Sequence, residues 1–153
     1  MKNKKLISLF AFLFLTTSIF AFEQKEISVK SNSMNKDVLV TVITPEGYST
    51  EQSYPVIYLL HGYGGNHTVW AQGGVVGQLA DQYNLIVVMP DGARDSWYFD
   101  SLVTPEYRYE TFVAKELVAH IDTAYSTIPN RANRAITGLS MGGHGAFYLA
   151  MRH

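Results

Sequence analysis

Residues 136–145 read Ile-Thr-Gly-Leu-Ser-Met-Gly-Gly-His-Gly, and this stretch decides the fold of the chain. The pattern indicates a short strand, a tight turn with Ser140 at its tip, and the start of a helix. A Cβ at Gly138 or Gly142 would collide across such a turn. The serine hydroxyl would stand clear of the sheet, and the free N–H groups of the helix would favour a developing negative charge. The stretch therefore predicts a nucleophile elbow with Ser140 as the nucleophile, although alone it also fits an ordinary glycine-rich turn.

A second glycine-rich loop follows an earlier apolar strand. Residues 56–60 are apolar on both faces, which is typical of a covered strand, and they lead into the loop 61–66, His-Gly-Tyr-Gly-Gly-Asn. Loops that follow parallel strands meet at the carboxyl edge of the sheet, so we expect this loop to lie beside Ser140. Acyl transfer by serine needs donors for an oxyanion. The backbone N–H groups of Met141 and Tyr63 are the expected pair.

The remainder of the chain alternates strands with helices. We expect an antiparallel pair of strands at 26–30 and 37–44, apolar strands at 85–89 and 134–138, and helices at 68–83, 107–125 and from 141 onwards. Within the first of these helices, the residues expected on the buried side are Trp70, Val75, Val76, Leu79 and Ala80. This order predicts an α/β fold with a mostly parallel, doubly wound sheet and helices on both faces.

The composition excludes several classes of function. The chain has 153 residues, of which 47% are hydrophobic and 16% charged, as in a folded domain with a real core. The net charge is −1 and no basic patch indicates a nucleic-acid partner. Cysteine is absent, which excludes a disulfide framework, a thiolate metal site and a cysteine nucleophile. His61 and His67 have no third ligand close by in the sequence, so we expect no zinc site.

The first 21 residues predict a secretory signal peptide. Three lysines precede a 16-residue apolar run that ends at Ala21, which fits a cleavage position, although Ile19 is bulky for the position three before the cut. An uncleaved membrane anchor is the alternative, but the run is shorter than the ~20 residues that span a bilayer. Removal of the leader would change the net charge from −1 to −4. We therefore expect a secreted or periplasmic protein without stable membrane insertion, whose domain begins at residue 22.

Four segments carry, in order, a resemblance to a known family: residues 54–66, 87–92, 96–98 and 138–146. They are similar to the esterase D group of α/β-hydrolases, which includes tributyrin, acetyl-xylan and feruloyl esterases, S-formylglutathione hydrolases and mycolyltransferases. The resemblance covers about residues 38–153. It implies an α/β-hydrolase fold and a serine carboxylesterase that acts on short-chain, aryl or acetyl esters, free or linked to polysaccharide, through an acyl-serine. Ser140 would be the nucleophile, the amides of Tyr63 and Met141 the oxyanion hole, and no metal or cofactor would be needed.

The chain departs from this family pattern after Ser140. The α/β-hydrolase order is Ser, then Asp or Glu, then His, whereas only thirteen residues follow Ser140 and none of them is acidic. We expect the catalytic acid and base beyond His153, and interpret residues 22–153 as the N-terminal half of an incomplete domain. Two alternatives stay open, an acyltransferase of the same fold and an inactive remnant or binding module. The sequence leaves the ester substrate and the oligomeric state undetermined.

Three further side chains are candidates around the elbow. His144 follows Ser140 by one helical turn, and we expect it to pack and hydrogen-bond beside the site rather than act as the base, because the family has a histidine here in addition to its base. His61 opens the oxyanion loop, where it either bonds the loop backbone or contacts substrate. Trp97 precedes Tyr98 in an aromatic loop that either lines an acyl or aryl pocket or packs locally.

Overall fold

The computed structural model describes residues 21–153; the predicted signal peptide, apart from Ala21, lies outside the described residues. The elements follow in the order β1 (Glu23–Ser31), β2 (Lys36–Thr44), β3 (Val56–Leu60), α1 (Val75–Tyr83), β4 (Ile86–Pro90), α2 (Tyr109–Thr111), η1 (Phe112–Leu117), α3 (Val118–Ala124), η2 (Arg131–Asn133), β5 (Arg134–Gly138) and α4 (Met141–Arg152). In this part of the chain, no helix combines the length and apolar character that crossing a membrane requires.

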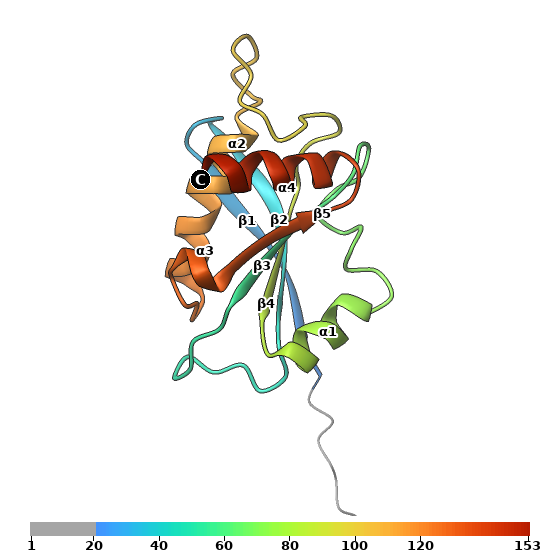
Figure 1. Ribbon diagram of the computed structural model, residues 1–153, viewed down its shortest axis with the longest axis vertical. Helices are drawn as coiled ribbons and strands as arrows, with labels where there is room; N and C mark the ends of the chain where they lie inside the picture. The colour runs from blue at the N-terminus through green and yellow to red at the C-terminus, as the bar shows by residue number, and fades with distance from the viewer. Residues whose placement is uncertain (1–20) are drawn as a thin grey trace, which may run out of the picture.

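The five strands form one mixed sheet in the order β1-β2-β4-β3-β5 (Figure 1). β1 and β2 form the expected antiparallel pair, and β2 also runs antiparallel to β4. β3 pairs in parallel with β4 on one side and with β5 on the other, where Leu60 lies opposite Gly138. The predicted α/β fold is confirmed, with its parallel part confined to β4, β3 and β5. These three strands end at the same edge, so the loops after Leu60, Pro90 and Gly138 lie near one another.

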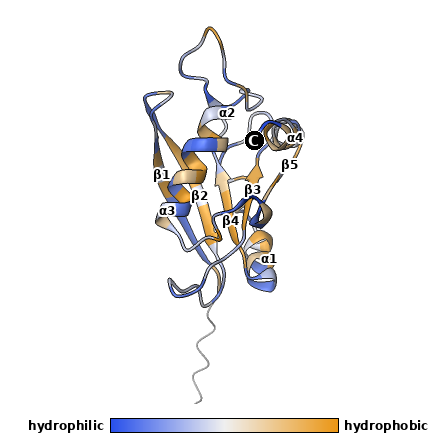
Figure 2. Ribbon diagram, turned by 60° about the vertical axis from the view of Figure 1, so that its left-hand side comes forward, coloured by the Kyte–Doolittle hydropathy of each residue, from blue (hydrophilic) through white to orange (hydrophobic). Residues whose placement is uncertain are grey.

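Helices cover both faces of the sheet because side chains alternate along each strand. On one face, Ile43, Val87 and Met89 pack against Ala80 of α1 and form a small core. On the other face lies the larger core, which includes these buried side chains from the sheet, η1, α3 and α4: Val40, Val42, Tyr58, Leu60, Val88, Phe112, Leu117, Ile121 and Leu149. The hydrophobic character of the central strands is visible in Figure 2.

Helix α1 is shorter than the sequence predicts. It begins at Val75 rather than near residue 68, because Gly73 and Gly74 take left-handed φ values of 79° and 73° that a helix cannot continue through. The prediction that Val75 and Leu79 are buried was wrong, since they are 60% and 44% exposed. Ala80 is buried as expected, and with Gly77 it forms the buried face of α1, where small residues allow close contact with the layer beneath.

Two other elements differ in detail from the expectation. The helix at 107–125 is confirmed in position, but its middle, Phe112–Leu117, is a π-helix, a wider turn that brings Phe112, Val113 and Leu117 into the core. β5 is an edge strand and not a strand covered on both sides. No strand among residues 21–153 pairs with the outer side of β5, and Ala135 and Thr137, which point to the same face of the sheet, are exposed.

Candidate active site

Ser140 lies on a strained turn between β5 and α4. Its φ of 54° and ψ of −117° are outside the regions that a non-glycine residue normally occupies, as a nucleophile elbow requires. A Cβ at Gly138 would lie 2.6 Å from the Leu60 carbonyl oxygen, and one at Gly142 would lie 2.7 Å from the His61 carbonyl oxygen. The expected collision at both glycines is therefore confirmed. The two glycines let α4 start directly against the end of β3, with Ser140 exposed at the tip.

The glycine-rich loop after β3 touches this turn. A Cβ built on Gly62 would lie 3.6 Å from the Ser140 Cβ and 3.3 Å from the Leu139 carbonyl oxygen. Gly62 and Ser140, 78 residues apart in the sequence, therefore lie so close that a methyl group on Gly62 would contact the Ser140 side chain. The sequence predicted this juxtaposition from the parallel order of the strands alone.

Some backbone amides of the glycine-rich loop and the Ser140 turn have a backbone acceptor, and others have none. The Gly64 N–H donates to the Arg94 carbonyl at 2.8 Å, and the Gly65 N–H donates within the loop at 3.0 Å. The Tyr63 N–H has no backbone acceptor among residues 21–153. Met141 is the first residue of α4, so its N–H is one of those that a helix leaves without an internal partner. The amides of Tyr63 and Met141 are thus available to an external acceptor.

The His61 side chain is buried and hydrogen-bonds both its own loop and the backbone of Gly92, after β4. Its side chain is 1% exposed, with Nδ1 2.8 Å from the Gly62 carbonyl oxygen and Nε2 2.8 Å from the Gly92 backbone nitrogen. The Gly92 N–H donates to Nε2, so Nδ1 is the ring nitrogen that can donate to the Gly62 carbonyl oxygen. His61 was expected either to bond the loop backbone or to contact substrate. The geometry favours the hydrogen bonds to the backbone, since neither ring nitrogen is free for a substrate.

Tyr98 belongs to the aromatic loop that was expected either to line a pocket or to pack locally, and the structure shows that it packs. Its side chain is fully buried and its hydroxyl donates to the His61 carbonyl oxygen at 3.1 Å. The ring fills the space that a Cβ would need at Gly92 and at Gly145 of α4. Burial raises the pKa of the Tyr98 phenol well above its ordinary value, so the hydroxyl stays a donor at neutral pH. The sequence contains both glycines, but only the fold brings them to opposite sides of one ring.

An exposed aromatic cluster lies beside the elbow. Trp97 is 44% exposed and has a left-handed φ of 52°, and its carbonyl oxygen accepts a hydrogen bond from His144 Nδ1 at 3.2 Å. The His144 ring stacks on Tyr148 with centroids 6.0 Å apart and meets Phe99 edge-on at 5.0 Å. His144 thus has the packing and bonding position that the sequence suggests. No histidine or carboxylate among residues 21–153 hydrogen-bonds the Ser140 hydroxyl.

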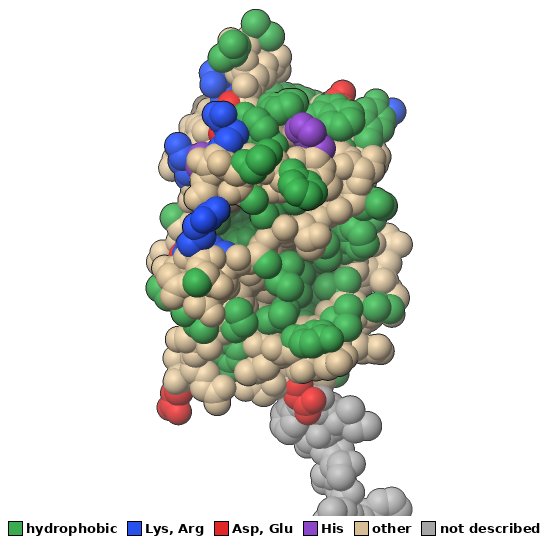
Figure 3. All heavy atoms as spheres, in the orientation of Figure 1, with side chains coloured by type: hydrophobic (Ala, Val, Ile, Leu, Met, Phe, Trp, Pro, Cys, Tyr) green, Lys and Arg blue, Asp and Glu red, His purple; other side chains and the backbone are tan. Residues whose placement is uncertain are grey.

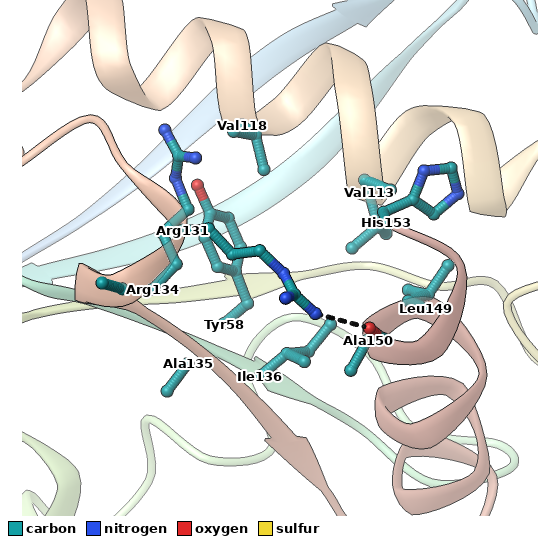
Figure 4. Close-up of a pocket in the computed structure, with 12 residues that line it drawn as sticks. Tyr58, Val113, Val118, Arg131, Arg134, Ala135, Ile136, Leu149, Ala150 and His153 are labelled. Atoms are coloured by element: carbon teal, nitrogen blue, oxygen red, sulfur yellow. Dashed lines mark hydrogen bonds between the residues drawn. The ribbon is translucent and has the colours of Figure 1, made fainter.

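A cavity lies away from Ser140. It has a volume of about 710 Å³ and lies between β5, α3 and α4, with Tyr58, Arg131 and Arg134 among its lining residues (Figure 4). Arg131 spans it and donates to the Ala150 carbonyl oxygen at 3.1 Å. A smaller hollow of about 290 Å³ also borders β5 and α4. In the space-filling view, hydrophobic side chains gather across this face (Figure 3). Both hollows therefore belong to the unpaired edge of the sheet.

The arrangement defines a class of protein. A strained serine between a strand and a helix, touched by the glycine-rich loop of the adjacent parallel strand, is the nucleophile arrangement of the α/β-hydrolases. Residues 31–153 match the family model described as "Putative esterase", and the chain belongs to this family. Among residues 21–153 no group of three His, Asp or Glu side chains has a metal-binding arrangement.

Individual relatives agree with this assignment. An acetyl esterase of Caldicellulosiruptor saccharolyticus is 33% identical over 102 residues, which cover 67% of this chain and 38% of that protein. An endo-1,4-beta-xylanase/feruloyl esterase of Xylanibacter ruminicola is 34% identical over 133 residues, 78% of this chain and 18% of that protein. The solved structure of a ferulic acid esterase aligns with a TM-score of 0.78 and 34% identity over 88% of this chain and 54% of that one. The chain thus spans about half the length of that structure and less of these relatives.

Proposed function

We propose that the protein is a secreted serine carboxylesterase that hydrolyses short-chain, acetyl or aryl esters. The observation that supports the proposal is the close approach of the strained Ser140 turn and the Gly62 loop. An acyl transfer needs a nucleophile beside oxyanion donors, and we assign these roles to Ser140 and to the Tyr63 and Met141 amides. Export is inferred from the leader pattern of residues 1–21.

The reaction follows from these positions. Ser140 Oγ attacks the ester carbonyl carbon, and the carbonyl oxygen, now negatively charged, accepts hydrogen bonds from the Tyr63 and Met141 amides. Each such donor lowers the barrier by about 3 kcal/mol. The C–O bond to the alcohol breaks and leaves an acyl-serine, which water then hydrolyses to the free acid. By the family's chain order, the residues that move the protons lie beyond His153.

The aromatic surface beside the elbow supports the choice of substrate class. Trp97 and Phe99 are 44% and 40% exposed, and both contact His144 one turn after the nucleophile. Flat, exposed rings of this kind can pack against an aryl group or cover a small acyl group. Relatives of this chain carry the names acetyl esterase and feruloyl esterase. We infer small-molecule or polysaccharide-linked acetyl and aryl esters as substrates.

The test is substitution of Ser140 by alanine in the full-length protein. We expect Ser140→Ala to abolish turnover of p-nitrophenyl acetate and covalent labelling by a fluorophosphonate probe, while the far-UV circular dichroism stays unchanged. The matched control is Ser53→Ala, an exposed serine that precedes β3 at the opposite end of the strand from the loop. Undiminished turnover in Ser140→Ala would exclude the proposal.

The acyltransferase alternative keeps the same acyl-serine and changes only the acceptor. Products are measured after adding an alcohol or sugar acceptor to the ester substrate. Release of the free acid at an unchanged rate supports hydrolysis, whereas transfer of most acyl groups to the acceptor assigns the site to an acyltransferase.

A further inference from the structure

Phe22 is the first residue of the described chain whose side chain contributes to the fold. Its ring packs against α1 at Gly77, where a Cβ would overlap the ring. The ring also borders the small core that contains Ala80 and Val87. Ala21, directly before it, is exposed. The folded domain therefore begins, in terms of packing, at residue 22.

The backbone nitrogen of Phe22 faces a carboxylate. It lies 3.3 Å from Asp81 Oδ2, and the other oxygen of the same carboxylate accepts the Glu46 N–H at 2.6 Å. Asp81 lies near the end of α1. Through these two hydrogen bonds it connects α1 to the residue before β1 and to the turn after β2. This position is at the edge of the sheet where β4 begins, opposite the edge that carries Ser140 (Figure 1).

The sequence and the fold point independently to the same peptide bond. The leader pattern ends at Ala21, and the contacts of the domain begin at Phe22. A cut one residue later would remove the Phe22 ring from its place on Gly77. A cut further upstream would leave the new terminus away from Asp81. Of the bonds in this region, only Ala21–Phe22 gives a terminus that keeps the ring and places its nitrogen against the carboxylate.

We propose that the Ala21–Phe22 bond is hydrolysed by a signal-peptide-removing protease and that the new ammonium group of Phe22 forms an ion pair with Asp81. One water molecule is consumed: the C–N bond breaks, the water oxygen becomes part of the Ala21 carboxylate that leaves with the leader, and both water protons go to the Phe22 nitrogen. Processing thus converts one neutral N–H donor into a charged group with three donors. Charge-assisted hydrogen bonds are about twice as strong as neutral ones, so cleavage tightens this contact. The inference rests on the proposed export and is independent of the esterase activity.

The first experiment determines the N-terminus. The full-length protein is exported from a secreting host with its own leader, and its N-terminus is read by Edman sequencing and intact mass. We expect Phe22 as the first residue. A mature protein that begins at any other residue, or that retains the leader, overturns the proposed cleavage.

The second experiment tests the ion pair by a cycle of variants. The mature protein with a free amino group is compared with its N-acetylated form, each with Asp81 and with Asp81→Asn. We expect Asp81→Asn to lower the melting temperature by about 2–4 °C more in the free form than in the acetylated form. The control, Asp37→Asn, changes an exposed carboxylate and should change the melting temperature by the same small amount in the free and the acetylated form.

If Asp81→Asn lowered the melting temperature equally in the free and the N-acetylated protein, the ion pair would be excluded. If Asp81→Asn does not fold, the acetylated and free forms with Asp81 intact decide the question, because acetylation alone must lower the melting temperature; equal values overturn the proposal. No readout uses an ester, so a failure of the proposed function leaves these outcomes unaffected.

Discussion

Tyr98 connects three parts of the site through one side chain. Its hydroxyl bonds the carbonyl of His61, while its ring separates Gly92 from Gly145. His61 in turn bonds the backbones of Gly62 and Gly92. The position of the loop that touches Ser140 therefore depends on a buried tyrosine and a buried histidine, neither of which reaches the surface. Both act by holding backbone groups in place.

Removal of the Tyr98 hydroxyl should loosen this loop. We expect Tyr98→Phe to lower the free energy of unfolding by about 1–2 kcal/mol, because the His61 carbonyl loses its donor in a buried position. We also expect kcat/KM for p-nitrophenyl acetate to fall by about tenfold, since small displacements of positioned groups are costly for catalysis. The control is Tyr83→Phe, whose ring is 62% exposed. Full activity in Tyr98→Phe would show that the hydroxyl does not position the loop.

Glu110 makes the fold sensitive to acid. Its carboxylate accepts hydrogen bonds from Tyr148 at 2.7 Å, from Arg152 at 2.8 Å and from His153 at 3.0 Å. Burial favours the neutral acid, but these three donors outweigh burial and lower the pKa of Glu110 to about 2. A lowered pKa means that the native state favours the charged form. The stabilisation is therefore complete above the ordinary pKa of 4.5 and is lost as the pH falls toward 2.

The Glu110→Gln variant tests this assignment. We expect it to lower the free energy of unfolding by about 1–3 kcal/mol at pH 7 and by much less at pH 2, where the native carboxyl is about half protonated and the carboxyl of the unfolded chain is protonated. Urea unfolding at both pH values measures the two differences. Glu51→Gln, an exposed glutamate outside this cluster, is the control. If the free energy of unfolding fell by the same amount at pH 2 and at pH 7, a stabilising role for the Glu110 charge would be contradicted.

At the scale of elements, the contact of α4 with the rest of the site depends on its glycines. A Cβ at Gly145 would overlap the ring of Tyr98, whereas one at Gly143, half a turn earlier, would meet only the Gly138 carbonyl oxygen at 3.3 Å. Helix propensity alone would make alanine better than glycine at either position, by about 1 kcal/mol. Packing and propensity therefore act in opposite directions at Gly145.

This difference gives a matched pair of variants. We expect Gly145→Ala to destabilise the protein by about 1–3 kcal/mol, because Tyr98 must move to admit the methyl group. Gly143→Ala should change stability by less than about 1 kcal/mol, since its gain in helix propensity offsets the tight carbonyl contact. Thermal or urea unfolding measures both. Equal stability of Gly145→Ala and Gly143→Ala would mean that α4 does not pack tightly against the Tyr98 ring at Gly145.

At the scale of the whole molecule, the outer side of β5 has no pairing strand among residues 21–153. Ala135 and Thr137 are exposed, and both cavities border this strand. The chain spans 54% of the ferulic acid esterase structure that it resembles. We infer that additional polypeptide pairs with β5 and covers these hollows in the complete domain, and that it carries the acid and base that Ser140 needs.

Comparison of two polypeptides tests this inference. We expect residues 22–153 alone to bind a hydrophobic dye such as ANS, to unfold with low cooperativity and to remain unlabelled by a fluorophosphonate. The full-length protein should bind little dye, unfold in one sharp transition and react with the probe. Rapid labelling of Ser140 in residues 22–153 would show that the base lies within this range.

The sequence determined the elements and their order because these depend on local patterns. Apolar runs gave β3 and β4, and the glycines flanking Ser140 specified a turn too tight for any other residue. The parallel order of β3 and β5 then placed the Gly62 loop beside Ser140, since loops after parallel strands share an edge. The family resemblance that these motifs carry is confirmed by the match over residues 31–153.

Only the tertiary structure decided which side chains hold the site together and which strand lies at the edge. The role of Tyr98 depends on Gly92 and Gly145 meeting across one ring, and periodicity along the chain contains no such information. β5 looks like a covered strand in sequence, but coverage depends on the neighbours a strand finds in space. The contact of Phe22 with Gly77 and Asp81 is likewise invisible in the sequence, because more than fifty residues separate the partners. Local sequence patterns specified the Ser140 turn, and long-range packing determined its surroundings.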